Sequence, residues 1–432
     1  MAKKRIVILG AGIAGLSAAW HLQRKGLDCV IFEKESEVGG LCRSKKIKGY
    51  TFDYCGHSLH FRTRYAFDLI KYLLDDNLSE HTRSAWVYSF NRFTRYPFQA
   101  NLYGLPHSIA QDCLLDFIKA SKNSRSKDIK LKSFSDWIEH TFGESIAKYF
   151  MIPYNHKFWT LSPRELTCEW LDGFVPVPSL KEVVEGTVKD SKRQFGYNAR
   201  FWYPKRAAIS QVPLAFAREV RNIFTDCQIS EINLEKKEIR MSSGNRERFD
   251  YLVSTIPLPE ISPIIKESPQ EIKLFFKKLK WNSVFNLNLG IDKKDTAKRH
   301  WVYFPGNDLC FFRVGFYHNF SSSIAPPDKG SLYVEVSYSK DKLLDKNSII
   351  SRIKGDLEKV GLIGAYDGIH AQHINDIKYA YPIYDQNYRQ AKGAIIDYLF
   401  CNNILPCGRY GSWRYMSMED SILDGKRTAE FF

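Results

Sequence analysis

The sequence predicts an α/β protein in which a Rossmann-type dinucleotide-binding domain is joined to a helical insertion and an antiparallel β-sheet domain. Three patterns predict this fold class: a strand, glycine turn, helix and strand within residues 5–33, helix-spaced apolar residues from 106 to about 192, and apolar strands between 249 and 338. A chain of 432 residues is too long for one ordinary core, so two or three domains are expected.

The first of these patterns is a complete strand–turn–helix–strand unit. An apolar strand at 6–9 runs into Gly10, Gly12 and Gly15, and the second strand ends at Glu33. Gly10 permits the tight turn, Gly12 lets the backbone approach a pyrophosphate, and Gly15 lets helix and strand pack closely. The helix N-terminus faces the negative charge, and Glu33 accepts from the ribose hydroxyls. We therefore predict a dinucleotide site, with a purely structural turn as the alternative.

The residues after Glu33 indicate which dinucleotide is bound. Gly39 and Gly40 mark a second place where backbone lies against a ligand, and Arg43 is suited to phosphate or flavin oxygens. An acid followed by Gly-Gly-x-x-Arg resembles the large group of FAD proteins that includes amine oxidases, protoporphyrinogen oxidase and UDP-galactopyranose mutase. The resemblance implies FAD as cofactor and the GR2-like form of the Rossmann-type domain.

The charge of the chain favours anionic ligands. Its formal net charge is +15, which suits nucleotide sugars, polyphosphates, a lipid headgroup layer or nucleic acid. The basic residues are spread along the chain without a nucleic-acid-binding module, so we expect an anionic small molecule first, peripheral membrane contact second, and no nucleic acid. A lysine-rich composition without functional meaning is the alternative. The sequence gives no prediction of oligomeric state.

The cysteines and the hydropathy indicate the compartment. The nine cysteines form no Cys-x-x-Cys pair, no apolar run approaches about 18 residues, and the apolar start at 6–9 is interrupted by the glycine turn. These features favour a cytoplasmic protein with reduced thiols, no metal site, no disulfide framework and no transmembrane helix.

The flavin domain is expected to be assembled from discontinuous pieces. Ser133 with Asp136 predicts the capped start of a helix in the insertion, and 249–257 is typical of a late strand of a flavin-binding sheet. Segments 284–290, 300–304, 311–317 and 332–338 alternate as expected for an antiparallel sheet with one exposed face. The predicted division is 1–62, 196–275 and 395–432 for the FAD-binding domain, 63–195 for a mainly helical substrate-side domain, and 276–394 for the antiparallel sheet of the substrate domain.

Two histidines follow the Gly-Gly segment closely. His57 and His60 lie in a loop that passes near the isoalloxazine ring in an FAD fold, where a histidine can hydrogen-bond its neighbours or tune the ring's electronics. Structural packing is the alternative for each.

Five further stretches resemble one family within this group, the UDP-galactopyranose mutases. They keep their order and extend the resemblance over nearly the whole chain. They are Gly-His-x-x-His at 56–60, Tyr-Pro-x-Gln-x-Asn at 96–101, Tyr-Asn-x-Lys-x-Trp at 154–159, the strands at 301–305 and 310–313, and the loop at 408–419.

The resemblance implies an FAD-dependent isomerase that interconverts the pyranose and furanose rings of a nucleotide-diphosphate sugar, in polysaccharide or glycoside biosynthesis. In that family N5 of reduced FAD attacks the anomeric carbon, and the resulting flavin–sugar adduct opens and recloses through a different hydroxyl. A reductant is needed to keep the flavin active, and NAD(P)H is a candidate.

The resemblance also assigns residues. Arg313 is implied to clamp the diphosphate, because the arginine fork matches paired phosphate oxygens, with an ion pair as the alternative. The other implied catalytic residues are His57, Tyr303, Tyr381 and Tyr415. The implied substrate-binding residues are Tyr96, Gln99, Asn155, Trp159 and Asn198, and the implied flavin contacts near the C-terminus are Gly408, Arg409, Met418 and Glu419. For the aromatic side chains, core packing is the alternative.

The sequence departs from the family pattern at two places. Phe174 stands where the family has a second diphosphate arginine, and Arg164, Lys181, Arg193 and Arg200 are candidate substitutes. The usual Gly-Gly after the Tyr-Pro-Lys segment is Ala-Ala at 207–208, whose Cβ atoms are expected to crowd a ligand on that turn. Both departures bear on the identity of the sugar nucleotide.

Two other functions stay open at this point. An oxidoreductase of the protoporphyrinogen oxidase or amine oxidase type passes a hydride to the flavin; Asn286 stands where amine oxidases bring a lysine towards N5. A flavin-bound protein with a binding role is the third reading, because fold does not fix function.

Overall fold

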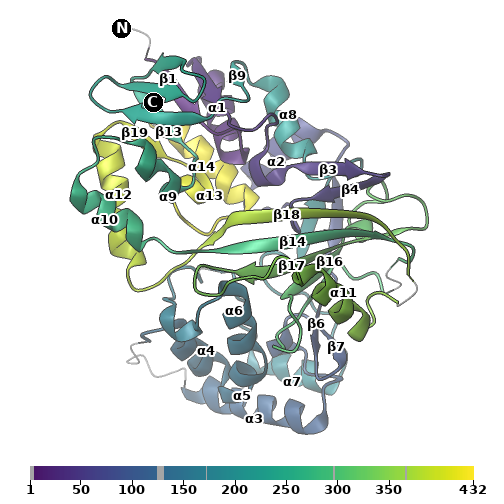
Figure 1. Ribbon diagram of the computed structural model, residues 1–432. Helices are drawn as coiled ribbons and strands as arrows, with labels where there is room; N and C mark the ends of the chain where they lie inside the picture. Colours follow the sequence, from purple (N-terminus) through teal and green to yellow (C-terminus); the bar gives the residue numbers. More distant parts are fainter. Residues whose placement is uncertain (1–3, 124–130, 172, 295–296, 365–366) are drawn as a thin grey trace.

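The computed structural model describes residues 4–123, 131–171, 173–294, 297–364 and 367–432. A parallel sheet with its helices occupies one end of the molecule, a sheet of long strands crosses the middle, and a group of helices forms the other end (Figure 1). The chain passes between these parts several times.

The parallel sheet confirms the Rossmann-type prediction. Its strands run in the order β19-β13-β1-β2-β9, and each adjacent pair is parallel. Helix α1 follows β1 directly, as the glycine turn predicts, and α14 and α8 pack on it. The bounds are β1 Ile6–Leu9, α1 Ile13–Arg24, β2 Cys29–Phe32, α8 Gln211–Glu219, β9 Ile223–Phe224, β13 Tyr251–Ser254, β19 Ile404–Pro406, α13 Gly408–Gly411 and α14 Met418–Glu430.

The central sheet differs from the prediction in two respects. Its order is β18-β14-β17-β16-β15-β6-β7, and β15 pairs with β6 in parallel, so the sheet is mixed rather than antiparallel. Strands β14 and β17 are buried almost throughout, so the expected exposed face is also wrong. The bounds are β6 Ala85–Ser89, β7 Arg92–Arg95, β14 Trp281–Ile291, β15 Trp301–Tyr303, β16 Arg313–Phe316, β17 Gly330–Tyr338 and β18 Ile369–Pro382.

Packing on both faces explains this burial. Helix α11 (Ile349–Lys359) covers one face through Ile349, Ile353 and Leu357. The opposite face lies against the end of β4 and the loop after it: the Cys55 N–H donates to the Asn286 side chain (3.3 Å), and the Asn288 side chain donates to the Asp53 carbonyl (3.2 Å). The polar side chains of Asn286 and Asn288 on this face are therefore buried and not exposed to solvent.

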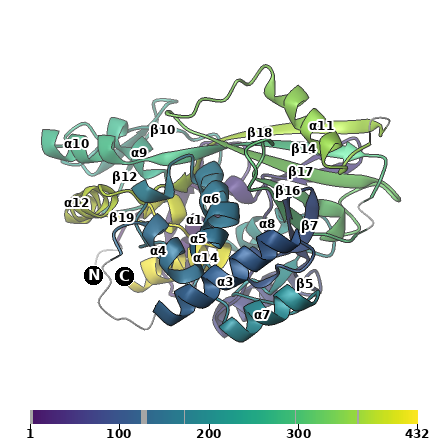
Figure 2. The same ribbon diagram turned by 90° about the horizontal axis from the view of Figure 1, so that it is seen from below.

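The predicted helical block forms the end of the molecule opposite the parallel sheet. Figure 2, seen from that end, shows α3 to α6 gathered side by side. The capping box of α4 is confirmed: Asp136 N–H donates to the Ser133 hydroxyl (3.2 Å), and Ser133 N–H donates to the Asp136 carboxylate (3.0 Å). The bounds are α3 His107–Asn123, α4 Phe134–Phe142, α5 Glu144–Ile146, α6 Ile152–Trp159 and α7 Leu180–Val188.

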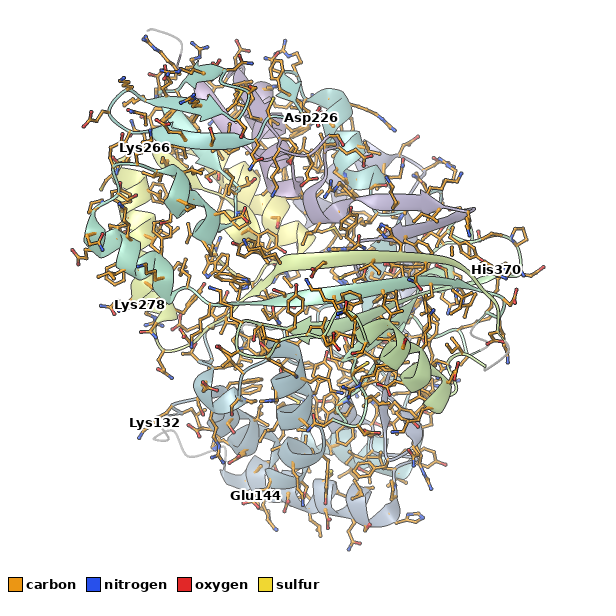
Figure 3. All side chains as sticks on the ribbon, in the orientation of Figure 1. Lys132, Glu144, Asp226, Lys266, Lys278 and His370 are labelled. Carbon is orange, nitrogen blue, oxygen red and sulfur yellow. The ribbon has the colours of Figure 1, made fainter. Side chains whose placement is uncertain are left out.

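The remaining elements connect these parts. They are β3 Ser44–Ile47, β4 Tyr50–Asp53, α2 Arg64–Leu74, β5 Ser79–Thr82, β8 Arg200–Tyr203, β10 Ile229–Asn233, β11 Glu238–Met241, β12 Arg246–Arg248, α9 Leu258–Ile261, α10 Gln270–Lys278 and α12 Tyr388–Cys401. The nine cysteines are free thiols. Among the described residues, no helix has both the length and the apolar character needed to span a membrane, and no cluster of ligating side chains could hold a metal ion. The labelled Lys132, Lys266 and Lys278 project from separate parts of the periphery (Figure 3).

Candidate active site

A cavity of about 1020 Å³ extends from the parallel sheet, past the central sheet, to the helical end. Its lining comes from the glycine turn after β1, the segments at 39–43 and 54–60, helix α6, strands β16 to β18 and the turn at 407–421. This volume is at the upper limit for ordinary ligand pockets. It therefore suits an extended dinucleotide together with a second ligand.

The first part of the cavity fits a dinucleotide. A Cβ on Gly15 would lie 2.0 Å from the Gly10 carbonyl oxygen, so helix α1 approaches the turn as closely as only glycine allows. The carboxylate of Glu33 is 6% exposed and accepts from the Ala11 N–H (2.7 Å) and the Glu35 N–H (3.0 Å), which fixes it at the end of β2. This arrangement suits an adenosine ribose and a pyrophosphate at the helix N-terminus.

The Gly-Gly segment lies beside this turn. Gly39 (φ +117°) and Gly40 (φ +57°) both adopt the left-handed region, and both line the cavity. Arg43 donates through Nε to the Gly40 carbonyl (2.9 Å), and its guanidinium lies 5.0 Å from the Tyr54 ring centre. The predicted cofactor residues near the N-terminus thus lie together on the cavity wall: Gly10, Gly12, Glu33, Gly39, Gly40 and Arg43. Gly15 is outside the lining and lets helix α1 pack against the turn.

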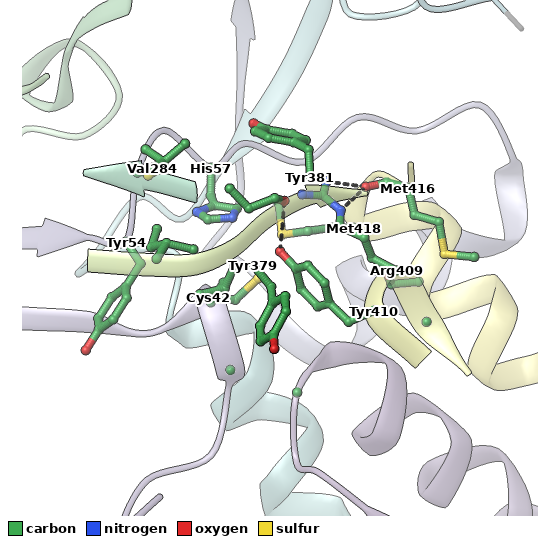
Figure 4. Close-up of a pocket in the computed structure, with 18 of the residues that line it drawn as sticks. Cys42, Tyr54, His57, Val284, Tyr379, Tyr381, Arg409, Tyr410, Met416 and Met418 are labelled. Carbon is green, nitrogen blue, oxygen red and sulfur yellow. Dashed lines mark hydrogen bonds between the residues drawn. The ribbon is translucent and has the colours of Figure 1, made fainter. Parts of the chain in front are cut away.

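The C-terminal turn closes the same wall. Gly408 (φ +77°) approaches α1 so closely that its Cβ would lie 2.4 Å from the Ala14 Cβ. Arg409 donates through Nε to the Met416 carbonyl (2.9 Å), and its guanidinium lies 5.4 Å from the Tyr381 ring centre (Figure 4). No ion pair joins Arg409 to a carboxylate within the described part of the chain, and Met418 completes the lining here.

Burial favours the uncharged form of both histidines. Burial, followed by the positive charges of Arg409 and Arg313, lowers the pKa of His57 to about 4. Its Nδ1 is buried without a hydrogen-bond partner among the described residues, and the ring lines the cavity. Burial also lowers the pKa of His60 to about 4; His60 contacts Ser58 (3.1 Å) and packs edge-on against Tyr197. His57 can therefore exchange hydrogen bonds with a bound flavin as an uncharged imidazole.

Arg313 is paired on the neighbouring strand. Register pairs Arg313 on β16 with Glu335 on β17, and Nη2 donates to the Glu335 carboxylate at 2.8 Å, with a second contact through Nε. Glu335 is 1% exposed, and both side chains line the cavity. The ion pair that was the alternative for Arg313 is thus present. Because Arg313 also lines the cavity, its guanidinium can contact a bound ligand as well.

Tyrosines line the substrate end of the cavity. Tyr303 lies 4.9 Å from Tyr96 between ring centres, and Tyr381 stacks on Tyr415 at 5.7 Å. Burial raises the pKa of Tyr96, Tyr381 and Tyr415, so these phenols keep their protons and can donate a hydrogen bond to a ligand. Phenol donors of this kind suit a ligand that carries negative charge.

The other predicted substrate residues divide into two groups. Gln99, Asn155 and Asn198 line the cavity. The amide of Gln99 donates to the Pro176 carbonyl (2.8 Å), and that of Asn155 donates to Met151 (2.8 Å). Trp159 is fully buried behind the wall, 5.0 Å from Trp170 between ring centres, and is outside the lining.

Glu419 is also outside the lining. Its buried carboxylate accepts from the N–H groups of Arg62 (2.9 Å) and Thr63 (2.8 Å) and from the Thr63 hydroxyl (2.8 Å). It therefore holds the loop that leads into α2. This role depends on the loop before α2 and has no signal in the C-terminal motif.

Phe174 lines the cavity where the family pattern has arginine, with its ring centre 4.7 Å from that of Tyr415. The four candidate substitutes lie outside the lining; Arg193 pairs with Glu182 (2.9 Å) and Arg200 with Glu80 (3.0 Å). The alanines at 207–208 are also outside it, so the expected crowding of a ligand there is not found, although Ala207 has φ +64°.

Sequence reasoning assigned no role to three buried polar residues. Lys157 donates to the carbonyls of Phe304 (3.0 Å), Leu309 (3.0 Å) and others of the β15–β16 loop, and burial lowers its pKa to about 8. Asp53 accepts from Tyr203 (2.5 Å) and Ser44 (2.6 Å) beneath the histidine loop. Arg83 lies behind Tyr96. Lys157 is the lysine of the Tyr-Asn-x-Lys-x-Trp stretch at 154–159, and that motif is the only sequence feature that points to it.

The fold and the cavity together define an α/β protein of the dinucleotide-binding flavoprotein class. The family described as "Flavin containing amine oxidoreductase" matches residues 13–430, and the chain belongs to this family. It is an FAD enzyme, an isomerase or an oxidoreductase.

Solved structures and curated relatives refine this comparison. A reduced UDP-galactopyranose mutase is similar over all of this chain and 94% of its own, with a TM-score of 0.94 and 26% identity. A putative protoporphyrinogen oxidase from Exiguobacterium sp. 255-15 shares the fold at a TM-score of 0.75 and 15% identity, over all of this chain and 99% of its own. A probable flavin-containing monoamine oxidase A of Dictyostelium discoideum is 22% identical over 61% of this chain and 59% of its own length. Protoporphyrinogen oxidase 2 of Arabidopsis thaliana is 26% identical over 35% of this chain and 32% of its own. The chain thus spans less than two thirds of these curated relatives.

Proposed function

We propose that the protein is an FAD-dependent nucleotide-sugar mutase that interconverts pyranose and furanose rings, in polysaccharide or glycoside biosynthesis. The whole-chain similarity to a UDP-galactopyranose mutase, at a TM-score of 0.94, carries the proposal. The cavity supports it, because Arg313, Tyr303, Tyr381 and Tyr415 share one wall near Arg409. The substrate we propose is a nucleotide-diphosphate sugar in the cytoplasm, where the nine free thiols stay reduced.

The reaction divides between cofactor and protein. Bound FAD in its reduced form supplies the nucleophile for the anomeric carbon. The phenols of Tyr381 and Tyr415 donate to oxygens of the departing diphosphate. Arg409 adds a positive charge that no carboxylate of the described residues pairs with, and the neutral His57 donates or accepts a hydrogen bond beside the flavin.

An oxidoreductase is the second candidate, since the family description names an amine oxidoreductase and both curated relatives are named as oxidases. The lysines in the described lining do not favour amine oxidation. Lys34 adjoins Glu33 at the ribose end, and Lys378 lies within 3.3 Å of Glu260 with 64% of its side chain exposed. Asn286 is fully buried outside the lining, where it accepts from Asn288 (3.1 Å) and Asn375 (2.9 Å).

The two functions make opposite demands on the flavin. The holoprotein, reduced with dithionite, is incubated anaerobically with a panel of UDP-, GDP- and dTDP-sugars, and the products are separated by chromatography. We expect one pyranose to be converted to its furanose by the reduced protein only, with no electron acceptor consumed; replacing dithionite with NADH or NADPH tests these reductants. Stoichiometric consumption of an acceptor without ring isomerisation would establish the oxidoreductase instead.

A further inference from the structure

Arg83 is a buried cation directly behind the substrate end of the cavity. It is 3% exposed, and its guanidinium lies 4.9 Å from the ring centre of Tyr96, which lines the cavity. Within the described chain, no ion pair joins Arg83 to a carboxylate. An arginine so deeply buried is normally paired, so this positive charge is unusual.

One short segment holds the Arg83 side chain. Nη2 donates to the Phe195 carbonyl (2.8 Å), Nη1 donates to Oδ1 of Asn198, and the Arg83 backbone N–H donates to the Ala199 carbonyl (3.0 Å). These contacts fix the guanidinium against residues 195–199. The charge therefore has a set position relative to Asn198.

The chemistry of the two groups determines which way the Asn198 amide faces. A guanidinium only donates, so Asn198 must turn its carbonyl oxygen towards Arg83. The amide nitrogen then faces away, and Asn198 lines the cavity. Its N–H groups are left for a ligand atom that accepts, such as a phosphoryl oxygen. The adjacent positive charge polarises the amide and strengthens such a bond.

The Arg83–Asn198 pair lies near Phe174, which stands where the family pattern has an arginine. Its ring lies in the same wall, 5.4 Å from Tyr197, the neighbour of Asn198. A phenylalanine gives no charge to a diphosphate, and Arg313 already shares its charge with Glu335. Arg409 lies 5.6 Å from the ring centre of Tyr415, and the wall beside Phe174 and Tyr197 gains a positive element only if Arg83 acts through Asn198.

We propose that Arg83 is a positioning residue that holds Asn198 with its amide N–H groups towards the cavity, and that this pair supplies the second anion-binding arm that Phe174 does not. The inference rests on the proposed function, because it takes the anion to be the diphosphate of a sugar nucleotide. It identifies the recognised atoms as acceptor oxygens and places them beside Asn198.

Titration calorimetry of the oxidised holoprotein tests this proposal with UDP, pyrophosphate and uridine as probes. Asn198→Asp keeps the Arg83 contact but presents an anion, and Arg83→Leu frees the amide to rotate; each is expected to weaken UDP and pyrophosphate binding at least about 10-fold, as expected for losing a charge-assisted hydrogen bond. Arg83→Gln keeps a donor for Oδ1 and loses only the charge, so an intermediate loss of about 3-fold is expected. Arg200→Gln, a surface arginine outside the lining, is the matched control.

The probes separate the inference from the proposed function. Loss of anion affinity with uridine binding and the flavin spectrum unchanged supports the positioning role, since a general structural defect would affect all three. Unchanged UDP affinity in both Asn198→Asp and Arg83→Leu overturns the inference and leaves the proposed function standing. Pyrophosphate binding that depends on Arg83 without any UDP binding supports the anion arm and counts against a nucleotide-sugar substrate. Binding of neither anion to the wild type overturns both. If Arg83→Leu does not fold, Asn198→Asp decides, because it retains the buried contact.

Discussion

Replacing Gly15 with alanine tests whether the turn after β1 is a dinucleotide cradle. The added Cβ would lie 2.0 Å from the Gly10 carbonyl oxygen, whereas ordinary contacts begin at 3.4 Å, so α1 must move by about 1.4 Å, the difference between these distances. Overpacking of this kind costs about 1–3 kcal/mol. Because the displaced groups are those that face the pyrophosphate, we expect the dissociation constant for FAD to rise about 5- to 150-fold.

The assay is quenching of flavin fluorescence during titration of apoprotein with FAD. Gly393→Ala is the matched control, because it is also a helical glycine and its Cβ meets nothing within 4 Å; this change is expected to leave FAD affinity unchanged and to add up to about 1 kcal/mol of helix stability. A Gly15→Ala protein that binds FAD as tightly as the control would refute the reasoning about this turn.

Three further predictions concern the cavity. Arg313→Ala should weaken UDP binding by at least about 2 kcal/mol, whereas Glu335→Gln, which removes the neighbouring negative charge, should strengthen it; equal effects in calorimetry would contradict a role for this pair in anion binding. His57→Gln should retain FAD but turn over more slowly, and full activity would reduce His57 to packing. Because the His57 pKa is about 4 when folded and about 6.5 when unfolded, its contribution to stability is complete above pH 6.5 and lost as the pH falls towards 4; the variant should show a shallower fall of melting temperature over this range. Lys157→Met leaves buried carbonyls without a donor and should destabilise the protein by at least about 2 kcal/mol, with unchanged thermal denaturation as the contrary result.

The dinucleotide end could be predicted from the sequence because its determinants are local. Gly10, Gly15 and Glu33 lie within one strand–helix–strand unit, so their spacing alone sets their geometry. The capping box of Ser133 is local for the same reason. Arg313 was predicted to face an anion, but its pairing with Glu335 depends on the register of β16 and β17, which no local pattern carries.

The missed features also depend on distant contacts. Strand β6 joins the central sheet from residues far earlier in the chain, so the parallel pair with β15 left no periodic signal. Arg83 reads as an ordinary polar residue until the segment at 195–199 folds over it. Glu419 is the last residue of the flavin-loop motif and yet holds the loop that leads into α2, because α14 begins beside that loop. In each case the role depends on a contact with a segment that is distant in the sequence, and the residues next to it in the sequence do not indicate it.

The assembly of the parallel sheet has a consequence for biosynthesis. Strand β19 pairs with β13 through Leu252 and Ile404, and Gly408 lies against Ala14. The N-terminal strands therefore leave the ribosome long before the segments that complete their sheet and close the cofactor wall. Contacts this far apart in the chain make folding slow, and the nascent apolar strands stay exposed meanwhile. Productive cofactor capture is thus expected only after the segment around Gly408 has been translated, so flavin supply and chaperone protection at that stage are expected to affect the yield of active protein.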